Sequence, residues 1–436
     1  MKIVFISDAC LPSPSAEALF VVRMAQALSE HGHDVILLVP DGKHERRTDT
    51  PTVAAYYGII PAFTTQPVAW PGGAKAIRLW AWRSARAARH WAPDLVYARH
   101  VAAGWAALEA GLRCIVELHQ GIQARPGQTG PAMDYLDDRL RQTGGRWQAV
   151  ASTRHAPAEA RDRRALASRG GYVQNITLLR RLAAYPNLVR VVVITHALAR
   201  DLCEAAPRLA SRILVAPDGA LLPTRPPGPA PFERGKTLCV GYCGHLYAGK
   251  GVEIIEAIAR RCPWAQFHVL GGLTADRERW RARTADCSNL VFHDHVEPHR
   301  VGDWLAAFDV CLLPNQPTVA TYQASRRGDT GTNIGAYTSP MKMFEYMAAG
   351  KPIVASDLAV LREILVDDTN ALLCGHDDVS AWAAALSRLA DDPALRQRLA
   401  AAARTDLEAH YTWSARASRV VAGLATTQPL TSPERL

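Results

Sequence analysis

Short apolar runs alternate with helical patterns along most of this chain. The first run spans residues 2–7, a helical pattern follows over 16–31, and a second apolar run spans 35–39. Short apolar runs separated by helix-length segments are typical of parallel strands joined by crossover helices. Further strand patterns follow at 94–97, 114–118, 190–195 and 212–216. Repetition of this unit predicts an open, doubly wound parallel sheet.

A second series of the same units follows a segment dense in proline and glycine, residues 223–236. Its strand patterns lie at 238–242, 266–270, 290–292, 310–313, 353–356 and 371–373. Such a segment is typical of an interdomain linker, and open parallel sheets bind ligands at the carboxyl ends of their strands. We therefore expect two α/β domains with a cleft between them.

The expected boundaries follow from these patterns. The N-terminal domain covers residues 1–222, the linker 223–236, and the C-terminal domain 237–410. Residues 411–436 are expected to form a helix and a tail, with the helix packing back on the N-terminal domain. Two polar segments, about 125–171 and 316–337, interrupt the strand patterns and are interpreted as excursions from the sheets.

Composition places the chain among globular proteins without a membrane span. It has 436 residues, of which 48% are hydrophobic, enough for two domains of about 200 residues each. No apolar run reaches the roughly 18 residues of a spanning helix, and the apolar run at the N-terminus is too short for a signal peptide. The nine cysteines show no paired spacing, which favours reduced thiols and a cytoplasmic location.

The net charge of +9 is confined to one half of the chain. Residues 1–220 carry 27 Lys and Arg against 18 Asp and Glu, whereas residues 221–436 carry 23 of each. This imbalance argues against a nucleic-acid partner and indicates a local basic surface. A helix over 74–93 would place Trp82 among the arginines 78, 86 and 89. Such a face docks on anionic lipid headgroups, or is a solvated face with Trp82 covered by a neighbouring loop.

The segment over residues 339–357 carries helix-start and helix-end signals around an apolar stripe. Ser339 is suited to cap the helix, Pro340 to its first turn, and Gly350 to the left-handed residue that ends it. A strand pattern follows directly. We expect the apolar stripe to face the core and the polar positions to face a ligand or solvent.

Two segments of the C-terminal domain suit an anion. Lys342 and Glu345 share one side of the helix just described, whose N-terminus favours a phosphate. Residues 244–251, GHLYAGKG, form a glycine-bounded loop in which Lys250 precedes a helix start. The loop lacks both the Walker ending and the Rossmann glycine triplet. The alternative interpretation is a surface helix with an ordinary ion pair.

Taken together, these segments resemble the nucleotide-binding domain of family 4 glycosyltransferases. The matching stretches are the glycine loop, EYMAAGKPIVASD, VLREILVDDTNALL, and in the N-terminal half VELH and ILVAPDGA. The resemblance implies the α/β GT-B fold, with two Rossmann-like domains facing across a cleft. It also implies retaining transfer of a hexose from a UDP- or GDP-sugar to a glycan, lipid-linked saccharide or small-molecule acceptor. Neither a metal nor another cofactor is expected.

The resemblance further implies a setting and a set of site residues. The setting is cell-envelope polysaccharide biosynthesis in the cytoplasm, with peripheral contact to the anionic inner face of the cytoplasmic membrane. The implied catalytic residues are His119 at the end of VELH, Lys250 on the diphosphate, and Glu345 on the ribose. The implied donor-binding residues are Ser15, Gly244, His245, Lys250, His295, Val296, Ser339, Pro340, Met341, Lys342 and Glu345.

The sequence departs from the family pattern in three places. Tyr337 stands where the family has a first glutamate, which contacts the transferred sugar. His245 stands where many relatives carry an arginine. Ser15 and Ala16 replace a glycine pair in the first loop. These departures put the identity of the sugar and the charge on the diphosphate in question.

Two other functions remain open from the sequence. A nucleotide-sugar epimerase has the same two-domain fold but needs positioned acid and base carboxylates. A non-catalytic sugar-nucleotide scaffold protein would explain Tyr337 and His245. The histidines 293, 295 and 299, with Asp294 and Glu297, also suggest a metal cluster, although the resemblance places this strand end beside the nucleotide base.

Overall fold

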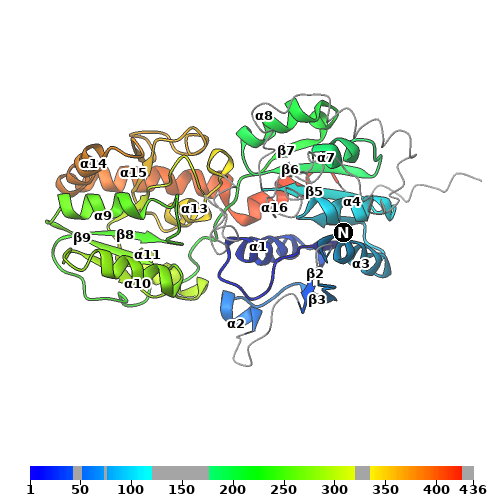
Figure 1. The fold of residues 1–436 in the computed structure, drawn as a ribbon, viewed down its shortest axis with the longest axis horizontal. Helices are drawn as coiled ribbons and strands as arrows, with labels where there is room; N and C mark the ends of the chain where they lie inside the picture. Colours follow the sequence, from blue (N-terminus) through cyan, green and yellow to red (C-terminus); the bar gives the residue numbers. More distant parts are fainter. Residues whose placement is uncertain (43–51, 73–75, 120–175, 320–333, 425–436) are drawn as a thin grey trace, which may run out of the picture.

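The protein folds into two α/β domains that lie side by side (Figure 1). The computed structural model describes residues 1–42, 52–72, 76–119, 176–319 and 334–424. The predicted excursion at 125–171 lies outside this part of the chain, as do residues 320–333 of the excursion predicted at 316–337.

The N-terminal domain contains a parallel sheet in the order β3-β2-β1-β4-β5-β6-β7. Its strands are β1 (Lys2–Ile6), β2 (Asp34–Asp41), β3 (Thr64–Ala69), β4 (Leu95–Ala98), β5 (Cys114–Leu118), β6 (Leu188–Val193) and β7 (Ile213–Val215). The order runs outward on both sides of β1, so the carboxyl ends of β1 and β4 lie next to a switch in winding direction, where such sheets bind ligands.

Helices pack on both faces of this sheet. They are α1 (Ala16–Glu30), α2 (Val53–Tyr57), α3 (Ala76–His90), α4 (Val101–Glu109), α7 (Ile176–Leu182) and α8 (His196–Ala205). The apolar pattern did not predict β3 or α2. β3 contains Pro67, which has no N–H to donate, and this residue is tolerated because β3 is an edge strand paired only with β2.

The C-terminal domain has a six-stranded parallel sheet in the order β10-β9-β8-β11-β12-β13. Its strands are β8 (Leu238–Cys243), β9 (Ala265–Leu270), β10 (Leu290–His293), β11 (Val310–Leu313), β12 (Ile353–Ser356) and β13 (Leu372–Cys374). Its helices are α9 (Val252–Arg261), α10 (Thr274–Arg283), α11 (Val301–Ala307), α13 (Met341–Ala348), α14 (Val379–Asp391) and α15 (Pro393–Asp406). The prediction of two doubly wound parallel-sheet domains is therefore confirmed.

The linker lies against the C-terminal domain. Asp303 receives two hydrogen bonds from Arg225 and one from the backbone N–H of Gly228. Phe232 stacks on His268 with ring centroids 4.0 Å apart. These contacts fix the path of the chain between the domains.

The last helix, α16 (Trp413–Val421), lies in the other domain, against α1 (Figure 1). Arg416 of α16 is 2% exposed and donates from Nη2 to Glu117 Oε1 at 2.5 Å. The same side chain donates to the carbonyls of Pro217 and Ala216. Because removing one partner of a buried ion pair costs about 3–5 kcal/mol, this pair holds α16 on the N-terminal domain.

One side of α3 is basic and exposed. Trp82 is 41% exposed and its ring meets that of Trp105 on α4 edge to face, with centroids 5.5 Å apart. Leu79 is 48% exposed beside it, and Arg86 is exposed too. Among the described residues Trp82 is therefore packed on one side by a neighbouring helix and stays partly exposed. None of the helices in the described ranges is long and apolar enough to cross a membrane.

Candidate functional site

A pocket of about 380 Å³ lies where the carboxyl edges of the two sheets meet. Its walls come from the loops that follow β1, β4, β5, β8, β9 and β10, from the turn before the linker, and from the start of α13. Every residue named above as catalytic or donor-binding lines this one pocket: Ser15, His119, Gly244, His245, Lys250, His295, Val296, Ser339, Pro340, Met341, Lys342 and Glu345.

Helix α13 begins one residue later than the sequence predicts. Pro340 is its N-cap, and no side chain caps the helix, so the prediction that Ser339 caps it is wrong. Ser339 Oγ instead accepts a hydrogen bond from the backbone N–H of Asp218, at 3.0 Å. The hydroxyl thus joins the start of α13 to the turn after β7, and the first residues of α13 line the pocket. Gly350, with φ of 60°, follows the helix as predicted.

Two lysines lie on the C-terminal side of the pocket. Lys342 Nζ donates to the hydroxyl of Tyr242 at 2.6 Å. Burial, and next the charge of Lys250, lower the pKa of Lys342 well below its usual value. Burial also lowers the pKa of Lys250, to about 8. Burial disfavours the charged form of both lysines, and Lys250 further disfavours that of Lys342, so a bound anion would stabilise both ammonium groups.

The glycine loop gives Lys342 its space. Gly244 has φ of 146°, and a Cβ there would lie 2.8 Å from Lys342 Nζ. A Cβ on Gly271, which follows β9, would lie 2.7 Å from the carbonyl oxygen of Gly244. Side chains at either position would displace the lysine or the loop, which explains why two glycines stand at these strand ends.

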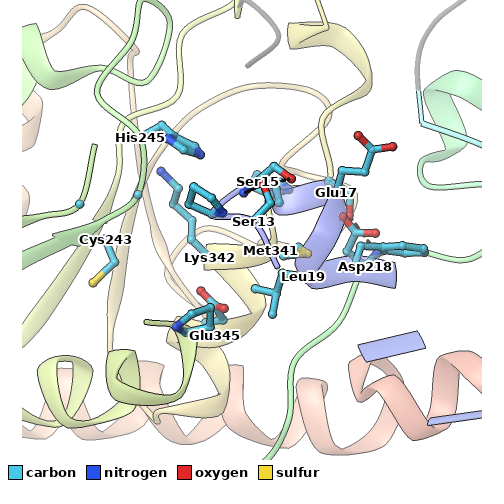
Figure 2. Close-up of a pocket in the computed structure, with 18 of the residues that line it drawn as sticks. Ser13, Ser15, Glu17, Leu19, Asp218, Cys243, His245, Met341, Lys342 and Glu345 are labelled. Carbon is cyan, nitrogen blue, oxygen red and sulfur yellow. Dashed lines mark hydrogen bonds between the residues drawn. The ribbon is translucent and has the colours of Figure 1, made fainter. Parts of the chain in front are cut away.

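Glu345 lies one helical turn after Lys342 on the pocket side of α13 (Figure 2). Burial raises the pKa of its carboxyl, and the nearby charges of Arg23 and Lys342 oppose that rise. Met343, Phe344 and Met347 face the core on the opposite side of the helix. The predicted separation of a core side from a pocket side on this helix is therefore confirmed.

His245 contributes no charge to the pocket. Burial, then Lys250 and Lys342, lower its pKa to about 3, so the imidazole is neutral at physiological pH. It is hydrogen-bonded to the backbone of Pro14 in the first loop of the other domain. At this departure from the expected family pattern, the chain therefore has a neutral bridge between the domains, with Lys250 and Lys342 close to it.

The N-terminal wall of the pocket contains a buried polar network. His119 Nε2 lies 2.6 Å from Glu117 Oε1, the oxygen that also accepts from Arg416. The hydroxyl of Tyr97 donates to the other oxygen of Glu117. Burial, and next Arg99, lower the pKa of His119 well below its usual value. A neutral His119 that donates through Nε2 presents Nδ1 as a hydrogen-bond acceptor.

A second pair lies beside this network. Arg99 Nη1 and Glu17 Oε1 are 2.5 Å apart, and the guanidinium lies over the ring of Phe20 with its carbon 4.9 Å from the centroid. The positive charge of Arg99 is thus paired within the wall. Glu117 could have been found from VELH, since residues two apart in a strand share a face. Arg416 had no local signal, because its carboxylate partner lies 299 residues earlier.

The histidine cluster that the sequence suggested as an alternative does not form within the described residues. His293 Nε2 lies 2.9 Å from His268 Nδ1, away from the pocket. His295 Nε2 lies 3.1 Å from the hydroxyl of Tyr56, and His299 Nδ1 is 3.4 Å from the carbonyl of the same residue. His293 is thus paired within its own domain, whereas His295 and His299 contact different atoms of Tyr56.

Tyr337 points away from the pocket. Its hydroxyl donates to Asp201 on α8 of the N-terminal domain, and burial, followed by that carboxylate, raises its pKa to about 12. Glu363 accepts hydrogen bonds from the N–H groups of His196 and Ala197 at the start of the same helix. At the position of the sugar-contacting glutamate this chain thus has a contact between domains.

Two family models match the chain. A model described as Glycosyltransferase Family 4 matches residues 18–220, and one described as Glycosyl transferase-like matches residues 250–422. A D-inositol 3-phosphate glycosyltransferase from Xylanimonas cellulosilytica is 29% identical over 234 residues, which cover 49% of this chain and 51% of that protein. A phosphatidyl-myo-inositol mannosyltransferase from Mycobacterium leprae is 38% identical over 89 residues, 20% of this chain and 24% of that protein. The chain thus spans about half or less of the length of these relatives.

Solved structures share the fold over nearly the whole chain. Sucrose-phosphate synthase from Thermosynechococcus elongatus has a TM-score of 0.62 at 16% identity, covering 96% of this chain and 97% of that one. HepE from Anabaena, solved in complex with UDP and glucose, has a TM-score of 0.61 at 14% identity, covering 98% and 100%. The lipopolysaccharide glycosyltransferase WaaG has a TM-score of 0.59 at 14% identity, covering 97% and 100%.

Proposed function

Because the chain belongs to the family 4 glycosyltransferases of the GT-B fold, we propose that it transfers a hexose from a UDP- or GDP-sugar to a hydroxyl, with retention of configuration. The acceptor is a glycan, a lipid-linked saccharide or a small molecule of the cell-envelope polysaccharide pathway. One observation carries the proposal: two buried lysines and the start of a helix converge on a pocket between the two sheet edges.

In this proposal the C-terminal half of the pocket binds the donor. Lys250 and Lys342 contact the diphosphate, and the N–H groups of α13 complete its hydrogen bonding. Glu345 accepts hydrogen bonds from the ribose hydroxyls. His295 and Val296, after β10, contact the base, and Ser15 meets the donor from the first loop. The leaving group is an anion, so cations already in place stabilise the charge that develops as the glycosidic bond breaks.

The proposed transfer takes place on one face of the sugar. The bond from the anomeric carbon to the β-phosphate oxygen breaks, and a bond to the acceptor oxygen forms on the same side. The leaving phosphate oxygen takes the acceptor proton, so the step needs neither a metal nor a second carboxylate. His119 faces the sugar and accepts a hydrogen bond from it through Nδ1. This arrangement favours a transferase over the epimerase or the scaffold protein.

A donor panel tests the proposal. The purified protein is incubated with UDP- and GDP-hexoses, with and without sugar acceptors, and released nucleoside diphosphate is measured. We expect turnover with at least one donor and binding of the matching nucleoside diphosphate by calorimetry. Absence of both turnover and binding across the panel would contradict the proposal, and binding without turnover would favour the scaffold protein.

We further propose that the basic side of α3 rests on the inner, anionic face of the cytoplasmic membrane. Arg86→Glu is expected to lower binding to vesicles of anionic phospholipid about fivefold or more, since a basic residue near such a surface contributes about 1 kcal/mol. Trp82→Ala is expected to lower it too, because an exposed aromatic ring no longer inserts at the headgroup boundary. Co-sedimentation measures the effect. Arg261→Glu, on an exposed position of the C-terminal domain, is the charge-matched control. Equal binding by all variants would contradict the proposal.

A further inference from the structure

Asp218 places a buried carboxyl group in the pocket wall. The residue lies in the turn after β7, is 5% exposed and lines the pocket. Within the described residues no group donates a hydrogen bond to Oδ1. Burying a carboxyl oxygen without a partner is unfavourable, and such groups in native proteins usually have a function. The carboxyl is therefore a candidate for contact with a ligand.

The turn itself does not explain this carboxyl. A Cβ at Gly219 would lie 2.5 Å from the carbonyl oxygen of Tyr411, so packing requires the glycine. The backbone N–H of Asp218 donates to Ser339. Neither contact involves the carboxyl group. The turn thus uses the backbone of Asp218 and Gly219, and the contacts that hold it do not use the Asp218 carboxyl.

The position of Asp218 links the two halves of the pocket. Through Ser339 it is tied to the start of α13, the element proposed to bind the donor. On its other side its charged and titratable neighbours are His119, Arg416, Glu117 and Arg99. Asp218 therefore lies between the proposed diphosphate site and the wall that contains His119. In the proposed reaction, the acceptor hydroxyl would enter between these two parts of the pocket.

Both arginines near Asp218 are already paired with carboxylates, so neither is a free cation for an anionic ligand. Arg99 is paired with Glu17, and Arg416 is paired with Glu117, each at 2.5 Å. The carboxyl of Asp218 adds a further acidic group to this wall. Figure 2 shows Glu17 and Asp218 on one side of the pocket, with Lys342 and His245 on the other. The cationic half thus suits the diphosphate, whereas the acidic half suits a group that donates a hydrogen bond.

We propose that Asp218 binds the nucleophilic hydroxyl of the acceptor, and that the part of the acceptor in this half of the pocket is an uncharged polyol. The inference rests on the proposed function and specifies its acceptor. A hydroxyl donates its hydrogen to the Asp218 carboxyl, which satisfies the buried oxygen and turns the hydroxyl oxygen toward the anomeric carbon. A phosphate or carboxylate substituent here would be repelled by the same group.

Kinetics of an isosteric variant test the role of Asp218. Asp218→Asn keeps the turn and its N–H, whereas Asp218→Ala removes the oxygens. With the most active donor and acceptor pair of the panel, we expect kcat/KM for the acceptor to fall about tenfold in the first variant and about a hundredfold in the second, the range for a lost hydrogen bond to a charged group. The affinity for nucleoside diphosphate should stay unchanged in both. Asp286→Asn, an exposed carboxylate paired with Arg260, is the matched control.

The results separate this inference from the proposed function. If wild-type protein releases no nucleoside diphosphate with any donor, the proposed function fails. If wild-type protein is active and both Asp218 variants match it within about twofold in acceptor kcat/KM, the role of Asp218 is wrong.

The charge of the acceptor is tested separately with matched probes. Wild-type rates are compared for glucose and glucose 6-phosphate, and for myo-inositol and inositol 3-phosphate. We expect the uncharged member of each pair to be used at least about tenfold better, as like-charge repulsion in a buried site predicts. A preference for the phosphate esters would overturn the assignment of an uncharged polyol.

Discussion

Replacing Lys250 by alanine is expected to lower kcat/KM for the nucleotide-sugar donor by about a hundredfold to a thousandfold, the range seen when one preorganised group opposite a developing charge is removed. The lysine is buried in the pocket wall, and alanine leaves no other cation at its position. Donor-dependent release of nucleoside diphosphate measures the loss, and circular dichroism checks the fold. Lys236→Ala, at an exposed linker position, should be as active as wild type. Unchanged kinetics of Lys250→Ala would remove this residue from the site.

The pH dependence of the wild-type enzyme is a second test of Lys250. Burial lowers the pKa of Lys250 to about 8, so the ammonium is charged below that pH and neutral above it. The charged form binds the diphosphate. Donor kcat/KM, which reports the free enzyme, should therefore fall as pH rises through about 8, by up to tenfold per pH unit. Lys250→Arg keeps its charge far above this range, so its profile should lack the decline.

Changing Glu345 to glutamine is expected to raise the donor KM about tenfold to a hundredfold, because hydrogen bonds from hydroxyls to a charged carboxylate become bonds to a neutral amide. The carboxylate also offsets the charges of Arg23 and Lys342 in the empty pocket. The measurement is a comparison of UDP with its 2′- and 3′-deoxyribose forms by calorimetry. Wild-type protein should prefer the ribose form, and the variant should bind all forms alike.

Glu278→Gln on the exposed side of α10 is the matched control for that measurement. A wild-type protein that binds ribose and deoxyribose forms equally would contradict the role given to Glu345. A variant that keeps the preference would contradict it too. Loss of all binding together with loss of the fold would point instead to a role of Glu345 in holding Arg23 and Lys342 in place, which thermal denaturation would show.

The fold was accessible from the sequence because it rests on local patterns. Buried strands such as β5 and β11 read as short apolar runs, and α13 shows a clear core side. β3 escaped detection because its exposed edge position leaves only one buried residue among TTQPVA. The start of α13 was misplaced by one residue because Ser339 has a partner in the other domain, which no local pattern reveals.

Some residues of the site could likewise be predicted from local sequence signals, and others could not. Lys250, Lys342 and Glu345 stand in segments with glycines and helix-start signals, so the sequence indicated them. The role of Arg416 depends on its ion pair with Glu117, a residue 299 positions away, so no local pattern indicates it. Asp218 stands out only because, among the described residues, no group donates a hydrogen bond to its Oδ1. The substitution at Tyr337 was visible in the sequence, but its pairing with Asp201 depends on how the domains face each other.

The packing of α16 also bears on how the protein is synthesised. Glu117 and its neighbours in the N-terminal domain obtain their guanidinium partner from residue 416. Until the last helix has been synthesised, the N-terminal domain therefore has a buried Glu117 that lacks its guanidinium partner and keeps only its bonds to Tyr97 and His119. We expect that domain to remain partly folded until synthesis is nearly complete, so a single cut in the linker would not yield two stable halves.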